Sequence, residues 1–384
     1  MVIKRAVLDK IKAKLEKGKV VVLYGPRRVG KTFVLKQLEK QLQGKETIAY
    51  FQGDRLVVRE MFSALSPEKM LDLIGAGTSL VILDEAQKIP LIGENLKLLV
   101  DTYPDLKIIA SGSASFELAS KIGEPLTGRK KTILLYPVWS QEIKETFSTQ
   151  YLLETLEDRL IFGSYPEVVL KTGRSEKIEY LFELVDSYLL KDILELENVR
   201  KPKKLLDLLA LLAFQVGKEV SISELADALE LAKGTVERYL DLFEKSFILV
   251  NIRGFSRNLR KEITKNSRWY FWDLGIRNAV INNFNPVSLR DDVGALWENF
   301  LVIERLKKQA YSGIFARNFF WRTWDQQEID WVEEREGKLF GYEFKWRKRK
   351  TKVPAAWRKA YPKALWKVIN RDNFLEFVGG DKSI

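Results

Sequence analysis

The stretch VVVLYGPRRVGKTFVLKQLEKQLQ, from Val20 to Gln43, runs from an apolar segment through a glycine-rich loop into an amphipathic pattern. The apolar segment predicts a buried strand, and the pattern after the loop predicts a helix. Gly25 and Gly30 let backbone N–H groups close around phosphates at the start of that helix. A glycine turn that merely contains Lys-Thr is the weaker alternative in this setting. The stretch therefore predicts a phosphate-binding loop (P-loop) in an α/β fold with a parallel sheet.

The residues of this loop have expected roles in holding a nucleotide and Mg²⁺. We expect Lys31 to contact the β- and γ-phosphates and Thr32 to bind Mg²⁺. The rest of the loop is expected to surround the phosphates, and consists of Gly25, Pro26, Arg27, Arg28, Val29 and Gly30.

A second apolar segment, SLVILDEAQKIP from Ser79 to Pro90, ends in two acids. A buried parallel strand delivers such side chains to the carboxyl edge of its sheet. We expect Asp84 to hold the metal with its water shell and Glu85 to polarise the attacking water. Capping of the following helix is the alternative, and it explains one carboxylate better than two.

The next predicted strand, LKIIASGS, ends in hydroxyl residues. Ser111 or Ser113 is a candidate to contact the γ-phosphate or the attacking water. Ordinary turn residues would produce the same pattern, so both interpretations stay open.

Four segments in this order, GPRRVGKT, LVILDEAQ, IIASGSAS and LTGR, resemble prokaryotic AAA-type P-loop ATPases that carry a C-terminal domain of unknown function. The later segments FGSYPEVV, WYFWDLGIRN, GALWENF and FFWRTWDQQEIDWVEE extend the resemblance over nearly the whole chain. The resemblance implies ATP as ligand, ATP hydrolysis, and a homo-oligomer as one option. It also implies that Arg129 senses the γ-phosphate or acts on a neighbouring subunit, with a plain surface arginine as the alternative.

The composition limits the available chemistry. The 384 residues include no cysteine and no histidine. This excludes disulfide frameworks, Cys/His zinc sites, thiol nucleophiles and histidine general bases. The N-terminus lacks a continuous apolar run, so we expect a soluble, cytoplasmic protein without a membrane segment.

Two basic stretches point to DNA as a partner. After a helical region, three predicted helices and a strand suggest a winged helix with a wing at Arg253–Arg268. Its expected recognition helix, Lys233–Lys245, has no net charge, so a packing adaptor is the alternative. The segment Lys338–Arg371 carries twelve Lys or Arg against Glu343, for a net charge of +11. Trp346, Trp357 and Trp366 lie within it, which supports nucleic-acid contact, and a solvated charged face is the alternative.

The C-terminal segments QEIDWVEER and KLFGYEFKW read as a hairpin with a two-residue turn at Glu336-Gly337. If Arg335 faces Lys338, then Asp330 faces Glu343 and Glu328 faces Lys345. This pattern resembles the core of the restriction-endonuclease-like fold. The resemblance implies that Asp330 and Glu343 hold Mg²⁺, with Lys345 positioning water and Glu298 as an additional acid. An inert scaffold, in which Lys345 neutralises Glu328 and Glu343, is the alternative.

The sequence thus predicts an α/β protein with a P-loop core over residues 1–145. A helical lid over 146–200, a winged helix over 201–275 and a restriction-endonuclease-like α/β domain over 276–384 are expected to follow. The expected function is Mg²⁺-dependent ATP hydrolysis on or near DNA, with a metal-dependent nuclease as an additional option. The alternative is a nucleotide-dependent regulatory switch that binds a protein partner and carries an inactive nuclease-like domain.

Overall fold

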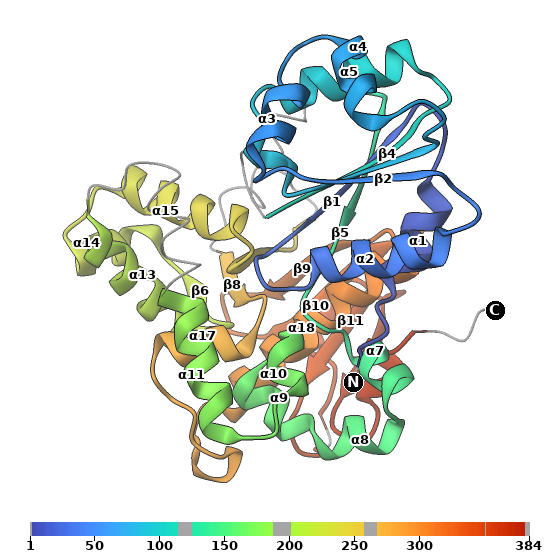
Figure 1. Cartoon of the computed structure of the whole chain (residues 1–384). Coiled ribbons are helices and arrows are strands. Elements are labelled where there is room, and N and C mark those ends of the chain that lie inside the picture. The colour runs from blue at the N-terminus through green and yellow to red at the C-terminus, as the bar shows by residue number, and fades with distance from the viewer. Residues whose placement is uncertain (1, 114–124, 187–200, 257–266, 350, 381–384) are drawn as a thin grey trace. The chain divides into compact units, whose positions relative to one another are not determined.

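The computed structural model describes residues 2–113, 125–186, 201–256, 267–349 and 351–380. The chain divides into two compact units, which are described separately (Figure 1). One unit is Arg5–Tyr136, and the other comprises Met1–Lys4 with Pro137–Ile384.

The Arg5–Tyr136 unit is built on a parallel sheet in the order β2-β3-β4-β1-β5. Its strands are β1 (Val20–Gly25), β2 (Ile48–Gln52), β3 (Leu80–Asp84), β4 (Lys107–Ser113) and β5 (Lys130–Leu134). Helix α1 (Val7–Lys14) precedes β1. The strands are connected by α2 (Lys31–Leu42), α3 (Leu56–Phe62), α4 (Pro67–Ile74) and α5 (Ile92–Thr102), with a short 3-10 turn η1 (Ala86–Lys88). The predicted α/β class with a parallel sheet is confirmed.

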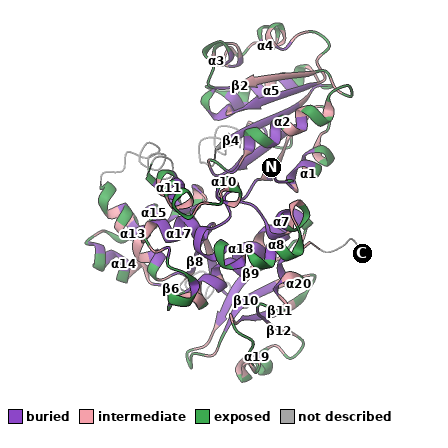
Figure 2. Cartoon of the chain, turned by 60° about the horizontal axis from the view of Figure 1, so that its bottom comes forward, coloured by how far each residue is buried: buried purple, intermediate pink, exposed green. Residues whose placement is uncertain are grey.

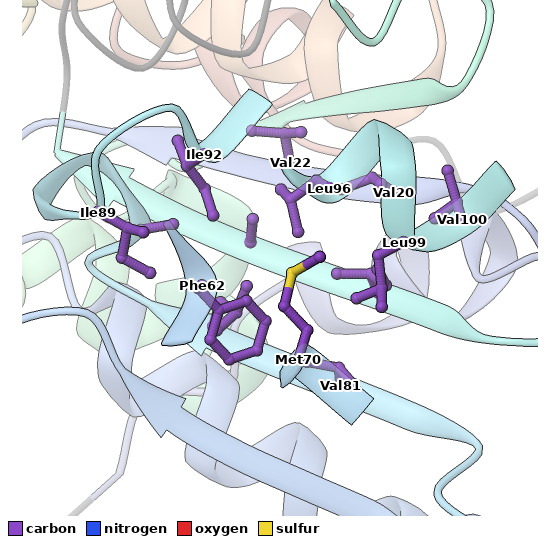
Figure 3. Close-up of a cluster of buried hydrophobic side chains, with 14 of the residues drawn as sticks. Val20, Val22, Phe62, Met70, Val81, Ile89, Ile92, Leu96, Leu99 and Val100 are labelled. Atoms are coloured by element: carbon purple, nitrogen blue, oxygen red, sulfur yellow. The ribbon is translucent and has the colours of Figure 1, made fainter. Parts of the chain in front are cut away.

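The core of this unit explains why its strands are continuous apolar runs. Every residue of β1 and β3 is buried, as expected when helices cover both faces of a parallel sheet. Phe62, Met70 and Leu96, from three helices, pack against Val22 and Val81 of the sheet (Figure 3). Removing a ring such as that of Phe62 would cost about 3–5 kcal/mol of stability. The sheet is therefore a rigid base for the loops at its carboxyl edge.

The second unit contains, in its described residues, a seven-stranded sheet in the order β12-β11-β10-β9-β7-β8-β6. Figure 2 colours most of β10 as buried. The strands are β6 (Glu219–Val220), β7 (Leu249–Gly254), β8 (Ser267–Phe271), β9 (Arg317–Arg322), β10 (Glu328–Arg335), β11 (Lys338–Phe344) and β12 (Leu365–Ile369).

Helices occupy most of the remainder of this unit. The first group is α7 (Ser140–Thr146), α8 (Thr149–Glu154), α9 (Leu156–Phe162), α10 (Pro166–Leu170) and α11 (Arg174–Leu184). The second is α13 (Pro202–Phe214), α14 (Ile222–Leu229), α15 (Lys233–Lys245), α17 (Leu274–Val280) and the 3-10 turn η3 (Val287–Leu289). The last is α18 (Val293–Ser312), α19 (Ala355–Ala360) and α20 (Phe374–Val378). None of the helices in the described ranges is long and apolar enough to span a membrane.

The region predicted as a winged helix shares its sheet with the C-terminal region. Helices α13, α14 and α15 come before β7 and β8 in the expected order, and β7 pairs in parallel with β9 at Arg253 and Gly254. Part of the expected wing, residues 257–266, lies outside the described residues. The predicted domain boundaries stay predictions, and the one at residue 275 falls between elements that contribute to a single sheet.

The predicted C-terminal hairpin is confirmed in its register. Arg335 faces Lys338 and Trp331 faces Tyr342 in an antiparallel pair. Glu336 and Gly337 have φ values of 51° and 70°, the left-handed conformation that a two-residue type I′ turn requires. The register is shown from Arg335 back to Trp331, and the predicted pairs of Asp330 with Glu343 and of Glu328 with Lys345 stay predictions.

Candidate functional site

The P-loop connects the end of β1 to the start of α2. Gly25 ends the strand, and a Cβ at this position would lie 2.3 Å from the Leu135 carbonyl oxygen. Gly30 has a φ of 92°, a left-handed conformation that residues with side chains rarely adopt. Both glycines are therefore required by the geometry of the loop.

Lys31 lies inside the loop. Its side chain is buried, and its ammonium donates hydrogen bonds to the carbonyl oxygens of Gly25 at 3.0 Å and Pro26 at 2.9 Å. The helix also begins at Lys31, so its first backbone N–H groups point toward the loop. A buried cation and a helix N-terminus together favour an anionic ligand.

Thr32 and Asp84, the two Mg²⁺ ligands predicted for the P-loop unit, are in direct contact. The Thr32 hydroxyl donates to Asp84 Oδ2 at 2.6 Å, and the Tyr50 hydroxyl donates to the same oxygen at 3.1 Å. The Ser111 hydroxyl donates to Asp84 Oδ1. Hydroxyl and carboxylate oxygens are the ligands that Mg²⁺ prefers, so these residues fit the ion.

Glu85 lies beside this cluster in a left-handed backbone conformation, with φ 54° and ψ 40°. Such a conformation costs about 1–3 kcal/mol for a residue other than glycine and is common at functional sites. Its carboxylate accepts a hydrogen bond from Gln87 Nε2 at 2.7 Å and does not cap the following 3-10 turn. The helix-capping alternative therefore does not account for Glu85.

Tyr50 and Arg5 also contact the site, although sequence reasoning missed both. Burial and the neighbouring Asp84 raise the pKa of Tyr50, so its phenol stays a neutral donor. Arg5 is buried and donates to the carbonyl oxygens of Val29 at 2.7 Å and Tyr136 at 2.6 Å. Arg5 lies among other charged residues near the N-terminus, and no sequence motif distinguishes it from them.

The other predicted residues of the P-loop unit have mixed outcomes. The Ser111 hydroxyl also accepts from the Glu85 backbone N–H at 3.3 Å, which keeps Ser111 next to the two acids. Ser113 ends β4 opposite Gly25, and its side chain lies outside the described part of the structure. Arg129 forms an ion pair with Asp101 at 2.5 Å on the surface of its unit, so its sensor role stays a prediction.

The C-terminal acids predicted as a nuclease site lie around two cations. Buried Arg268 donates to Glu328 at 2.9 Å and to Glu298 at 3.3 Å. Lys345 forms an ion pair with Glu343 at 2.6 Å. In the inert-scaffold alternative, Lys345 neutralises both Glu328 and Glu343. In the structure Lys345 pairs with Glu343, and Arg268 pairs with Glu328.

Asp330 is buried among these groups. One of its oxygens accepts a hydrogen bond from the Phe344 backbone N–H at 2.7 Å. Burial, followed by the charges of Glu298 and Glu343, raises its pKa well above the ordinary value. Burial also raises the pKa of Glu298. Within the described residues, no group of three or more acidic side chains is arranged to hold a metal ion.

Two predictions about the nucleic-acid surface are corrected by the structure. Arg268, counted as part of the wing, is 4% exposed and is held by Glu298 and Glu328, so it is unavailable to DNA. Trp357 is 1% exposed and packs in a hydrophobic cluster with Phe255 and Trp321, so its ring cannot stack on a base.

The basic segment nevertheless exposes many cations. Trp346 packs against the Trp297 ring and under the Arg371 guanidinium, which gives it a structural role. The exposed basic residues of the segment include Arg347, Lys348, Arg349, Lys352, Arg358, Lys359 and Lys363.

Comparison with protein families divides the chain into three matches. Residues 17–144 match an AAA domain, residues 153–287 a Domain of unknown function (DUF8612), and residues 293–377 a Domain of unknown function (DUF4143). These matches support an AAA-type P-loop domain followed by a C-terminal domain of unknown function, as the sequence motifs implied.

Similar proteins come from distant organisms. An uncharacterized protein of Mycobacterium tuberculosis is 26% identical over 349 residues, covering 89% of this chain and 74% of the relative. An uncharacterized protein of Methanocaldococcus jannaschii is 25% identical over 383 residues, covering 94% and 82%.

Solved structures resemble the chain only weakly. Pif1 helicase from Candida albicans has a TM-score of 0.28 at 13% identity over 48% of each chain. Drosophila ORC bound to DNA has a TM-score of 0.26 at 10% identity, covering 72% of this chain and 92% of that one. At such TM-scores neither likeness carries an argument about function.

Proposed function

We propose that this protein is an Mg²⁺-dependent AAA-type ATPase that acts on DNA. The observation that carries the proposal is the contact between Thr32 and Asp84 beside a buried Lys31. Lys31 and Thr32 of the loop lie next to Asp84, which is 52 residues further along the chain than Thr32, at the edge of a parallel sheet where P-loop proteins bind nucleotide phosphates.

Each residue has a role in this reaction. Lys31 binds and orients the phosphates, because its ammonium lies within the loop. Thr32 and Asp84 hold Mg²⁺, which when bound neutralises negative charge on the phosphates. Glu85 orients the attacking water and accepts its proton. Ser111 keeps Asp84 and the Glu85 backbone in place through its hydroxyl.

The DNA part of the proposal rests on the exposed cations of the basic segment. Arg347, Lys348 and Arg349 are exposed side by side after β11. Such residues contact phosphates without reading sequence, and the affinity they provide falls steeply as salt concentration rises. We therefore propose binding with little sequence preference.

A second candidate function is a regulatory switch in which ATP state controls the choice of a protein partner. It is favoured by the hydrogen bond between Gln87 and Glu85, which keeps the expected catalytic carboxylate occupied. In this case hydrolysis is slow, and the C-terminal acids form an inactive nuclease-like scaffold neutralised by Arg268 and Lys345. A metal-dependent nuclease at Asp330 and Glu343 is the less favoured proposal, because both cations already neutralise acids there.

ATP turnover by the full chain, measured with and without DNA at several salt concentrations, tests these functions. We expect turnover that depends on Mg²⁺ and increases when DNA is added. In the variant with Glu in place of Arg347, Lys348 and Arg349, DNA should no longer increase the turnover. Lys40→Glu, on an exposed position of α2, is the control for charge reversal. Slow turnover unaffected by DNA would instead favour the regulatory switch.

A further inference from the structure

Trp324 is fully exposed, with a relative exposure of 102%. Three other tryptophans, Trp297, Trp331 and Trp357, are at most 1% exposed. An indole is a large apolar group, and leaving it in water gives up the stabilisation that burial provides. A single exposed aromatic residue is not unusual in itself, so the surroundings of Trp324 decide its significance.

The turn that carries Trp324 is held by its own hydrogen bonds. It connects β9 to β10, and the Thr323 backbone N–H donates to the Gln327 carbonyl at 2.9 Å. The Gln326 backbone N–H donates to the Thr323 carbonyl at 3.0 Å, and the Gln327 N–H donates to the Thr323 hydroxyl at 3.1 Å. The indole is therefore presented on a preorganised turn, which lowers the entropy cost of binding.

The same turn is tied to a basic helix. The side chain of Gln327 accepts a hydrogen bond from the Ala356 backbone N–H, in the first turn of α19, at 3.0 Å. Trp357 anchors α19 to the sheet, with its ring centroid 5.2 Å from that of Trp321 in β9. Trp324 and α19 thus belong to one connected structure.

Residues 352–363 contain no acid and expose four cations, namely Lys352, Arg358, Lys359 and Lys363. Asp325 is the acidic residue beside Trp324 in the turn, and it repels phosphate there. Anionic groups of a ligand are therefore attracted to the α19 side of the turn, while the indole face stays available to an uncharged aromatic group.

We propose that Trp324 and the cations around α19 form a stacking site for a single-stranded segment of nucleic acid. This inference rests on the proposed action on DNA. It specifies that the protein binds a single-stranded segment through an unstacked base. An unstacked base lies on the indole while neighbouring phosphates contact Arg358 and Lys359. Duplex DNA fits less well, because its bases are already stacked on one another.

The test is a titration of fluorescein-labelled oligothymidylate with the full chain, followed by anisotropy. We expect Trp324→Ala to weaken binding about tenfold, an effect within the range that stacking one base on an aromatic side chain contributes. Trp324→Phe should restore most of the loss. Phe315→Ala, at another aromatic residue that is 92% exposed, is the matched control and should leave the affinity unchanged.

Salt dependence separates stacking from charge. Trp324→Ala should leave the slope of log affinity against log salt unchanged, whereas the pair Arg358→Glu and Lys359→Glu should make it shallower. A duplex of the same length should bind the parent and Trp324→Ala with similar affinities. A parallel titration with oligouridylate distinguishes RNA from DNA as the source of the base.

The outcomes separate this inference from the function on which it rests. If the parent binds oligothymidylate and Trp324→Ala binds it equally well, the stacking site is overturned while DNA binding stands. Failure of the parent to bind any nucleic acid overturns both. A loss for Trp324→Ala that Trp324→Phe does not restore, or that Phe315→Ala shares, also contradicts stacking.

Discussion

The P-loop site and the C-terminal acidic cluster both gather carboxylates beside a sheet, but their carboxylates have different partners. Asp84 accepts hydrogen bonds from the uncharged hydroxyls of Thr32, Tyr50 and Ser111. In the C-terminal cluster, Glu298 and Glu328 are paired with Arg268, and Glu343 with Lys345.

The difference has a chemical consequence. Hydroxyl groups carry no positive charge, so they do not neutralise a carboxylate. A hydroxyl can also rotate so that its oxygen coordinates a metal ion. A guanidinium or ammonium already supplies the positive charge that a metal would bring. The same residue type at similar positions in a sheet can therefore serve as a metal ligand in one unit and as part of an internal salt link in the other.

The largest expected effect is that of Lys31→Ala on nucleotide binding. In the proposed role, Lys31 donates charge-assisted hydrogen bonds to the phosphates, each worth about 1.5–3 kcal/mol, so we expect ATP affinity to fall roughly a thousandfold. A titration with a fluorescent ATP analogue measures this change. Lys40→Ala, from the same helix, should bind like the parent. Equal binding by Lys31→Ala would mean that the loop does not hold the phosphates.

Glu85→Gln should retain ATP binding and lose turnover. General base catalysis contributes about 10²- to 10⁴-fold, and the amide cannot accept the proton from water. Phosphate release under saturating ATP measures the change, and Glu94→Gln on the exposed side of α5 is the control. Turnover at the parent rate would remove Glu85 from the reaction and favour another residue near Asp84.

Two features of these sites could be predicted from the sequence. The contact between Thr32 and Asp84 follows from the glycine loop and the rule that parallel strands bring their carboxyl ends to one edge. The register of the C-terminal hairpin, from Trp331 to Arg335, follows from a two-residue turn. Both are consequences of local pattern and of regular sheet geometry.

Other features depend on which distant elements meet. Arg268 reaches Glu298 and Glu328 because β8 lies in the same sheet as β10 and α18 packs against β8. The charge pattern of the wing instead places Arg268 among the residues expected to contact DNA. Trp357 is buried because α19 packs on the sheet, whereas Trp324 is exposed because a turn holds it outward. Composition alone could not distinguish these two tryptophans.

Arg268→Met tests the second half of the comparison. Methionine keeps much of the side-chain volume but leaves Glu298 and Glu328 without their cation. Breaking a fully buried pair costs about 3–5 kcal/mol, and we expect a smaller loss here because the Glu298 and Glu328 side chains are 18% and 45% exposed. Chemical denaturation measures the loss. We expect the pKa of Glu298 to rise further, so the variant should be least unstable at low pH.

Thermal melting with Mn²⁺ tests whether Arg268 takes the place of a metal ion in the C-terminal cluster. In an Asp84→Asn background, which removes the P-loop contribution, Mn²⁺ should leave the melting temperature of the parent cluster unchanged and raise that of Arg268→Met. An increase for the parent that Glu343→Gln abolishes would instead support a metal site at Asp330 and Glu343. DNA cleavage dependent on Lys345 would extend that result to a nuclease.

The smallest expected effect concerns Asp273, a buried acid of the C-terminal unit. Like Asp84, it accepts hydrogen bonds from uncharged donors. Its oxygens accept from the backbone N–H groups of Ser164 at 2.6 Å and Gly275 at 2.9 Å. Burial nevertheless raises its pKa from 3.8 to about 6. The folded state therefore holds the proton more tightly than the unfolded state does.

The sign of the pH effect follows from that difference. The stabilisation from protonated Asp273 is fully present below pH 3.8 and is lost as pH rises to about 6. Asp273→Asn cannot titrate, so the free energy of unfolding of the parent relative to this variant should fall by about 3 kcal/mol over that range. Urea denaturation at a series of pH values measures it. A constant difference would mean that the backbone N–H groups of Ser164 and Gly275 offset the cost of burying the charged carboxylate.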